Sequence, residues 1–126
     1  MAARKLVIIV DDDTSVLRAV QRVVKLHGFE AQVFDTVEGF RAEARLCEAT
    51  CLILDIHLDG MTGTDLAGQL ARSGCSLPVI FITAADSPVT REAAREAGGV
   101  AYLRKPFPSK HLIEAINKAL QTDAAC

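Results

Sequence analysis

Short hydrophobic runs alternate with longer amphipathic stretches along the whole chain. The runs are rich in Val, Ile and Leu, which is typical of strands, whereas the longer stretches place apolar residues at the helical period. The pattern predicts five strands, at 5–10, 30–34, 51–55, 79–82 and 100–103. It also predicts one helix after each strand, at 15–27, 37–46, 64–72, 88–97 and 109–120.

The first, third and fourth hydrophobic runs are apolar at nearly every position. A strand has that composition when helices cover both faces of its sheet. We therefore expect an α/β fold with an open, doubly wound, parallel five-stranded sheet of the flavodoxin-like (βα)5 type. Right-handed crossovers favour the strand order 2-1-3-4-5. The segment 56–63, which contains two glycines, is expected to be a loop.

The length of 126 residues fits a single domain spanning 1–126. Half of the residues are hydrophobic and only 5% are aromatic, so the core should be aliphatic. The net charge is -2 with both signs mixed along the chain, which argues against direct nucleic-acid binding. The chain has neither the roughly 20 apolar residues that cross a membrane nor a secretory signal, so we expect a cytoplasmic location.

The four cysteines do not form a recognisable metal site. Cys47 and Cys51 are four residues apart rather than in a CxxC pair, and the three histidines are isolated in the sequence. In a cytoplasmic protein, we expect these two residues, Cys75 and Cys126 to be reduced, structural thiols.

Carboxylate, hydroxyl and ammonium groups follow the predicted strands. Asp11 and Asp12 come directly after the first strand, Asp55 ends the third, Thr83 follows the fourth, and Lys105 lies just beyond the fifth. Because the carboxyl ends of parallel strands meet at one edge of the sheet, these side chains should converge. Carboxylates there could hold Mg²⁺, one of them could accept a phosphoryl group, and the lysine could neutralise the transferred oxygens.

Each of these residues also has an ordinary structural explanation. An Asp pair after a strand commonly caps the next helix, a lone threonine is more often a cap, and a lone lysine is usually a solvated charge. The joint placement of compatible groups at four strand ends favours the site instead. Asp13 is expected to act as a helix cap or a supporting residue.

Four segments resemble one known family. They are IIVDDD at 8–13, LILDIHLDGMTG at 52–63, ITAA at 82–85 and YLRKPF at 102–107. In this order and spacing they closely resemble the receiver domain of bacterial two-component response regulators, over essentially the whole chain. Within that family the chain looks most similar to the FixJ-type regulators.

The resemblance implies a role for each polar residue at the strand ends. Asp55 becomes the phosphoacceptor, and Lys105 becomes the ionic partner of the phosphoryl group. Asp11 and Asp12 become, together with Asp55, ligands of Mg²⁺, and His57 contributes its backbone carbonyl to the metal.

The resemblance also implies a conformational readout. Thr83 becomes a switch hydroxyl that binds the phosphoryl group, and Tyr102 becomes the aromatic residue that moves with it. A histidine kinase or a histidine phosphotransfer protein would be the donor. The fourth helix, fifth strand and fifth helix would present the changed surface to an output domain, a partner protein or a second copy of the chain. Such a domain is a switch rather than an enzyme.

The chain departs from the family pattern four residues after the phosphoacceptor, where Asp59 replaces the usual proline. This change removes a restraint on the loop and adds a carboxylate near the site. His57 and Ala85 occupy the two positions that tune phosphoryl lifetime in the family, so the lifetime here stays open. The family also implies a cis peptide bond between Lys105 and Pro106.

Two other functions fit parts of the pattern. A phosphatase of the haloacid dehalogenase type also uses an aspartyl nucleophile, but it needs a second Asp two residues on, where this chain has His57. A degenerate receiver would act as a phosphate-independent binding module, and the intact set of site residues argues against it. Whether the chain acts alone or belongs to a longer, DNA-binding regulator stays open.

Overall fold

The computed structural model describes residues 4–122 and contains a five-stranded parallel sheet. The strand order in space is β2-β1-β3-β6-β7, which confirms the predicted order 2-1-3-4-5 of the five main strands. The five strands are β1 (Leu6–Val10), β2 (Glu30–Phe34), β3 (Ala49–Asp55), β6 (Val79–Thr83) and β7 (Gly99–Arg104).

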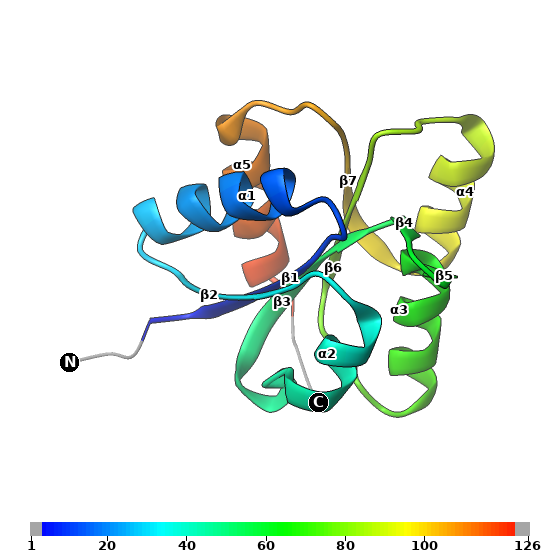
Figure 1. Cartoon of the computed structure of the whole chain (residues 1–126), viewed down its shortest axis with the longest axis horizontal. Helices are drawn as coiled ribbons and strands as arrows, with labels where there is room; N and C mark the ends of the chain where they lie inside the picture. The colour runs from blue at the N-terminus through cyan, green and yellow to red at the C-terminus, as the bar shows by residue number, and fades with distance from the viewer. Residues whose placement is uncertain (1–3, 123–126) are drawn as a thin grey trace.

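Helices cover both faces of this sheet (Figure 1). The helices are α1 (Thr14–Leu26), α2 (Val37–Glu43), α3 (Gly63–Arg72), α4 (Pro88–Glu96) and α5 (Ser109–Leu120). Helices α1 and α5 pack on one face, and α2, α3 and α4 lie on the other. The arrangement is the predicted doubly wound α/β fold.

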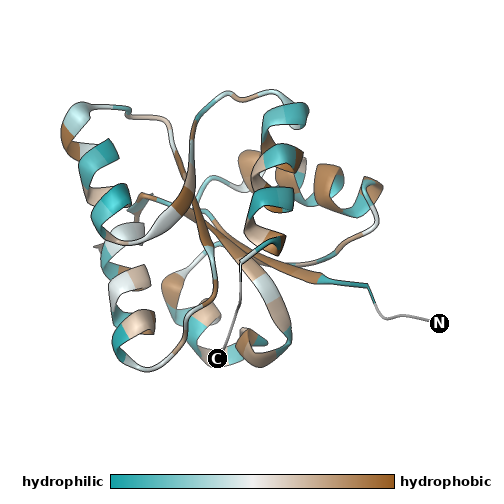
Figure 2. Ribbon diagram, turned by 180° about the vertical axis from the view of Figure 1, so that it is seen from behind, coloured by the Kyte–Doolittle hydropathy of each residue, from teal (hydrophilic) through white to brown (hydrophobic). Residues whose placement is uncertain are grey.

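The core is formed by the central strands, whose side chains point alternately to the two faces. In β1, Val7 and Ile9 pack toward α1 and α5, whereas Ile8 and Val10 pack toward the opposite layer. All four are fully buried. Figure 2 shows the result as apolar strands at the centre with polar positions on the outer faces of the helices.

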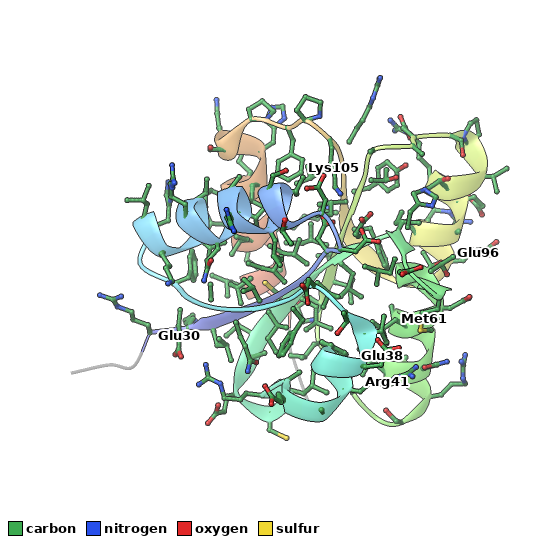
Figure 3. The ribbon with its side chains drawn as sticks, in the orientation of Figure 1. Glu30, Glu38, Arg41, Met61, Glu96 and Lys105 are labelled. Atoms are coloured by element: carbon green, nitrogen blue, oxygen red, sulfur yellow. The ribbon has the colours of Figure 1, made fainter. Side chains whose placement is uncertain are left out.

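The expected loop at 56–63 was wrong in one respect. It contains a small antiparallel pair, β4 (His57–Leu58) and β5 (Met61–Thr62), joined at Gly60 with a positive φ of 88°. Strands of two residues are too short to produce a recognisable period in the sequence. Arg41 of α2 lies against this hairpin, with its guanidinium 3.5 Å from the sulfur of Met61 (Figure 3).

Helix α2 ends three residues earlier than the sequence predicts, at Glu43. The Gln32 side chain donates to the carbonyl of Glu43 at 3.0 Å and accepts from the amide of Arg45 at 2.9 Å. These bonds satisfy backbone groups that a longer helix would have used. A short 3₁₀ turn, η1 (Leu46–Glu48), then leads into β3.

The prediction of reduced thiols was wrong for Cys75 and is confirmed for Cys47 and Cys51. Cys75 is disulfide-bonded, whereas Cys47 and Cys51 are thiols, and Cys126 lies outside the described residues. Burial raises the pKa of the Cys51 thiol to about 12. The prediction rested on sequence spacing and compartment, and neither reports which cysteines the folded chain brings together.

Within residues 4–122, no helix has the length and apolar character that a membrane span requires. The peptide bond between Lys105 and Pro106 is cis, as the family resemblance implied.

Candidate functional site

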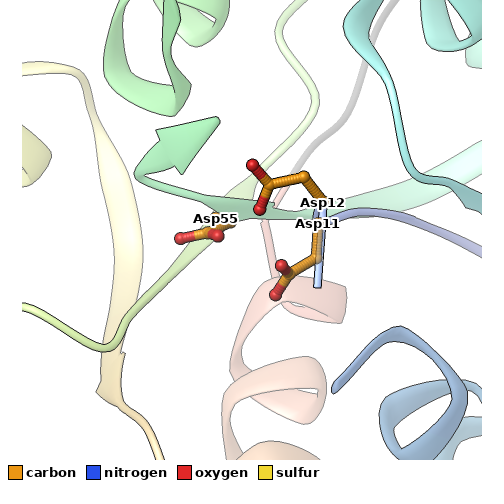
Figure 4. Close-up of side chains that lie close together, drawn as sticks. All are labelled: Asp11, Asp12 and Asp55. Carbon is orange, nitrogen blue, oxygen red and sulfur yellow. The ribbon is translucent and has the colours of Figure 1, made fainter. Parts of the chain in front are cut away.

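Three carboxylates meet at the carboxyl edge of the sheet. Asp11, Asp12 and Asp55 each offer an oxygen, and these oxygens lie within 4.8 Å of one another (Figure 4). The strand register places Asp11 beside Asp55, because Val10 pairs with Leu54 and these two acids are the next residues, and Asp12 follows Asp11. Asp11 and Asp55 are buried, whereas Asp12 is exposed. The cluster therefore has one side open to solvent.

Lys105 approaches the cluster from the end of β7. Its Nζ lies 2.7 Å from Oδ2 of Asp11 and 3.3 Å from Oδ2 of Asp55, and only 12% of its side chain is exposed. The Lys105 amide donates to the carbonyl of Thr83 at 2.7 Å, which fixes the lysine backbone beside β6. Burial alone lowers the pKa of Lys105, but the two carboxylates outweigh that effect and the pKa is raised.

Asp11 is the most deeply buried acid of the site, with 0% exposure. Burial raises its pKa, and the nearby Asp55 charge acts in the same direction, whereas the contact with Lys105 lowers it. Oδ2 of Asp11 forms an ion pair with the lysine at 2.7 Å, and no other partner of this buried oxygen is found among the described residues. A divalent cation would give this oxygen a second partner.

The oxygen-only donor set and the buried Asp11 oxygen fit Mg²⁺, which prefers carboxylates and keeps several waters. Asp55 is held by its own loop, because its Oδ1 accepts from the amide of His57 at 3.1 Å. The imidazole of His57 is exposed and lies on β4.

Gly63 presses against the backbone of Asp55. A Cβ added there would lie 2.2 Å from the carbonyl oxygen of Asp55, so only glycine fits at the start of α3. The glycine amide donates to the carbonyl of Ile56 at 2.8 Å. The helix start and the end of β3 therefore form one rigid junction beneath the acid.

Thr83 ends β6, the strand between Asp55 and Lys105. Its side chain is buried, and its Oγ1 accepts a hydrogen bond from the amide of Ala85 at 3.0 Å. Because a hydroxyl has one hydrogen to donate as well as lone pairs, Thr83 can also donate to an anion near Asp55.

Tyr102 lies on β7, outside the carboxylate cluster. Its hydroxyl donates to Oδ1 of Asp86 at 2.7 Å, and the guanidinium of Arg91 lies 5.1 Å from the centre of its ring. Arg91 also forms a two-pronged ion pair with Asp86, with both bonds at 2.8 Å. In the same segment, the side chain of Ser87 caps α4.

Asp59 lies apart from the three-carboxylate cluster. It lines a neighbouring acidic groove together with Asp12, Asp35 and Glu38. Asp13, in contrast, caps α1 as expected, with its carboxylate accepting from the amides of the first turn. Asp59 therefore adds a carboxylate to the groove at the rim of the site and does not join the cluster of Asp11, Asp12 and Asp55.

Comparison with known proteins identifies the family. The family model described as the response regulator receiver domain matches residues 7–117. Nodulation protein W of Bradyrhizobium diazoefficiens is 32% identical over 123 residues, covering 97% of this chain and 54% of that protein. The response regulator protein TmoT of Ectopseudomonas mendocina is 35% identical over 114 residues, covering 90% and 51%. The chain spans about half the length of these curated relatives.

Solved structures agree with this result. The crystal structure of FixJ-N superposes with a TM-score of 0.84 at 26% identity, covering 99% of this chain and 100% of that one. A CheY-like receiver domain protein from Methanospirillum hungatei gives a TM-score of 0.83 at 27% identity, covering 94% of each chain. The chain belongs to the receiver domain family of two-component response regulators.

Proposed function

We propose that the chain is a phosphorylation-activated signalling switch whose phosphoacceptor is Asp55. The observation that carries this proposal is the contact of Lys105 with Asp11 and Asp55 in a cluster of three carboxylates at the strand ends. The donor is a histidine kinase or a histidine phosphotransfer protein. The whole described chain acts as a single receiver domain.

In the proposed transfer, a carboxylate oxygen of Asp55 attacks the phosphorus of a phosphohistidine. A P–O bond forms, the P–N bond breaks, and the donor histidine leaves as imidazole. Lys105 then pairs with the phosphoryl oxygens and offsets their charge. Asp11 and Asp12 would hold Mg²⁺ together with Asp55 and the backbone carbonyl of His57. When bound, this ion neutralises charge on the transferring oxygens.

The readout begins at Thr83, which donates its hydroxyl hydrogen to a phosphoryl oxygen in the phosphorylated form. Tyr102 moves with it, and the surface of α4, β7 and α5 then favours a partner. That partner is an output domain, another protein or a second copy of the chain. The roughly twofold greater length of the curated relatives supports an output region elsewhere in a longer protein.

Phosphorylation by acetyl phosphate, read by intact mass, tests the proposal. Wild type should gain one phosphoryl group only in the presence of Mg²⁺, and Asp55→Asn should gain none. Asp59→Asn is the matched control, because Asp59 lies on the same loop but outside the carboxylate cluster. The control should be labelled like wild type.

Two other results would change the proposed function or the proposed phosphoacceptor. Folded wild type that is never labelled, whatever the donor, would favour the phosphate-independent binding module. Label that persists in Asp55→Asn but disappears in Asp59→Asn would move the acceptor to the rim of the site.

A further inference from the structure

We propose that Asp86 and Arg91 form a latch on Tyr102 that opposes switching, so that they are positioning residues for the phosphorylation response. The Tyr102 latch consists of these three side chains. This inference rests on the proposed function, because the latch gains meaning only if Thr83 responds to a phosphoryl group on Asp55.

The latch joins three parts of the fold. Asp86 lies on the β6–α4 connection, Arg91 on α4 and Tyr102 on β7. The Tyr102 hydroxyl donates to Asp86 at 2.7 Å, and both prongs of the Arg91 guanidinium donate to the same carboxylate at 2.8 Å. Hydrogen bonds to an ionised group are shorter and stronger than neutral ones. One carboxylate thus holds the strand and the helix together.

The electrostatics of the latch agree with its geometry. The hydrogen bonds from Arg91 and then Tyr102 lower the pKa of Asp86 to about 2. Burial, followed by the hydrogen bond to Asp86, raises the pKa of Tyr102 to about 12. The aspartate is therefore ionised and the phenol protonated throughout the physiological range, and the latch does not depend on pH there.

A short segment couples the latch to the site. Thr83 Oγ1 accepts from the amide of Ala85, and Asp86 is the next residue. Movement of Thr83 toward a phosphoryl group on Asp55 would draw this segment with it and displace the carboxylate that Tyr102 and Arg91 share. Phosphorylation therefore has to break or rearrange the latch, and latch strength sets part of the cost of switching.

Helix α4 begins directly after Asp86, so a displacement of Asp86 can move the start of this helix. Ser87 caps the helix by accepting from the amide of Thr90, and the carbonyl of Ser87 accepts from the amide of Arg91. A shift of Asp86 is thus transmitted to the first turn of α4. Further along, Arg95 pairs with Glu92 and forms no hydrogen bond with Tyr102 among the described residues. Arg95→Ala is therefore a matched control.

Tyr102 provides its own spectroscopic signal, because the chain has one tyrosine and no tryptophan. The charged groups that act on it are Asp86 and Arg91, with Arg104 acting on Asp86. In an absorbance titration of the phenol, Asp86→Ala should lower the midpoint and leave it above the ordinary value of about 10, because burial remains. Arg91→Ala should not lower it, since the Arg91 charge favours the phenolate. The Arg95→Ala control should match wild type, and far-UV circular dichroism identifies the range over which each protein stays folded.

Binding of beryllofluoride with Mg²⁺, a phosphoryl mimic, tests the coupling. We expect Asp86→Ala and Arg91→Ala to lower the apparent dissociation constant of beryllofluoride by about 3- to 10-fold, because switching then breaks fewer favourable interactions of the latch. Arg95→Ala should bind like wild type. In a Tyr102→Phe background, Asp86→Ala should change the dissociation constant clearly less, because the hydrogen bond from the Tyr102 hydroxyl to Asp86 is already absent. The amide signals of Thr83 and Ala85 in NMR spectra report the binding.

The outcomes separate the two proposals. Wild type that binds the mimic while both latch variants bind equally well or more weakly would overturn the latch and leave the proposed function intact. An unchanged phenol midpoint in Asp86→Ala would also overturn the latch. Wild type that never binds beryllofluoride would overturn the proposed function, and the coupling to Thr83 with it.

Discussion

Asp11 is held in the folded protein at an energetic cost. Its carboxylate is completely buried, one of its oxygens has only the ion pair with Lys105 among the described residues, and burial raises its pKa. A group whose pKa is raised on folding favours the folded state at low pH and opposes it as the pH rises through the folded pKa. The ionised Asp11 therefore reduces stability at neutral pH when no cation is bound, even with Lys105 nearby.

Replacement of Asp11 by asparagine should consequently stabilise the metal-free protein at pH 7, because it removes a buried charge and its repulsion with Asp55, while Lys105 keeps Asp55 as a partner. The asparagine oxygen can still accept from the amide of Asp13, which donates to Asp11 Oδ1 at 2.9 Å. The measurement is urea unfolding with EDTA, with Asp59→Asn as the control. The difference from wild type should shrink as the pH falls and Asp11 becomes protonated. A variant less stable than wild type at pH 7 would contradict this account.

The same experiment with Mg²⁺ should reverse the order. A ligand at a hundred times its dissociation constant stabilises the folded state by about 2.7 kcal/mol. Wild type should gain this amount at saturating Mg²⁺, whereas Asp11→Asn should gain far less because a ligand is missing. Equal gains in both proteins would remove Asp11 from the metal site.

Among the elements, the junction of β3 and α3 fixes the backbone of Asp55. Gly63 begins α3 where a Cβ would lie 2.2 Å from the carbonyl oxygen of Asp55. Because the clash is with backbone, no side-chain movement can relieve it. The loop between them carries the β4–β5 hairpin, so the helix, the hairpin and the acid keep one relative arrangement.

Gly63→Ala should therefore lower the free energy of unfolding by about 2–4 kcal/mol. Gly68→Ala on the same helix is the control, since its Cβ would meet only the flexible head of Arg72 at 3.3 Å. Alanine in a helix interior is up to about 1 kcal/mol better than glycine, so the control should be neutral or stabilising. Similar losses in both variants, measured by urea unfolding, would exclude the backbone clash as the cause.

The helices and strands differed in how well the sequence predicted them. The last helix was predicted with its observed limits, 109–120, because its apolar residues keep a regular helical period. The end of α2 was missed because it depends on Gln32, which reaches it from a neighbouring strand. Contacts between elements leave no period in the sequence.

The residues of the site also differed in how well the sequence predicted them. Asp11, Asp12, Asp55 and Lys105 were predicted together because strand order alone brings the ends of their strands to one edge. Asp86 was not singled out as a contact of Tyr102, because that contact depends on how α4 and the loop before it dock on β7. No pattern within either segment reports this docking.

At the scale of the whole molecule, two helical layers share the same three central strands. Ile53 of β3 packs in the core beside α1 and α5, and the adjacent Leu54 packs in the core on the opposite face. Each strand of β1, β3 and β6 contributes to both cores in this way. Neither layer can lose its packing without exposing the strands of the other, so unfolding should be a single cooperative transition.

Ile53→Ala and Leu54→Ala test this cooperativity as a matched pair. Both side chains are fully buried, and each truncation should cost about 2–5 kcal/mol. In urea, far-UV circular dichroism and the near-UV signal of Tyr102 should give coincident transitions in both variants. A variant in which the two signals separate would show that one layer unfolds on its own.

The apolar central strands also have a consequence for biosynthesis. β1 is the first strand made, and its first partner β2 begins at Glu30, so at about 5–20 residues per second β1 waits roughly 1–4 s for it and longer for β3. During that time five apolar residues are exposed in a segment suited to intermolecular pairing. The acids at 11–13 follow directly and place like charges beside it, which disfavours such pairing. The acids proposed to serve signalling would then protect the nascent chain from aggregation before the site exists.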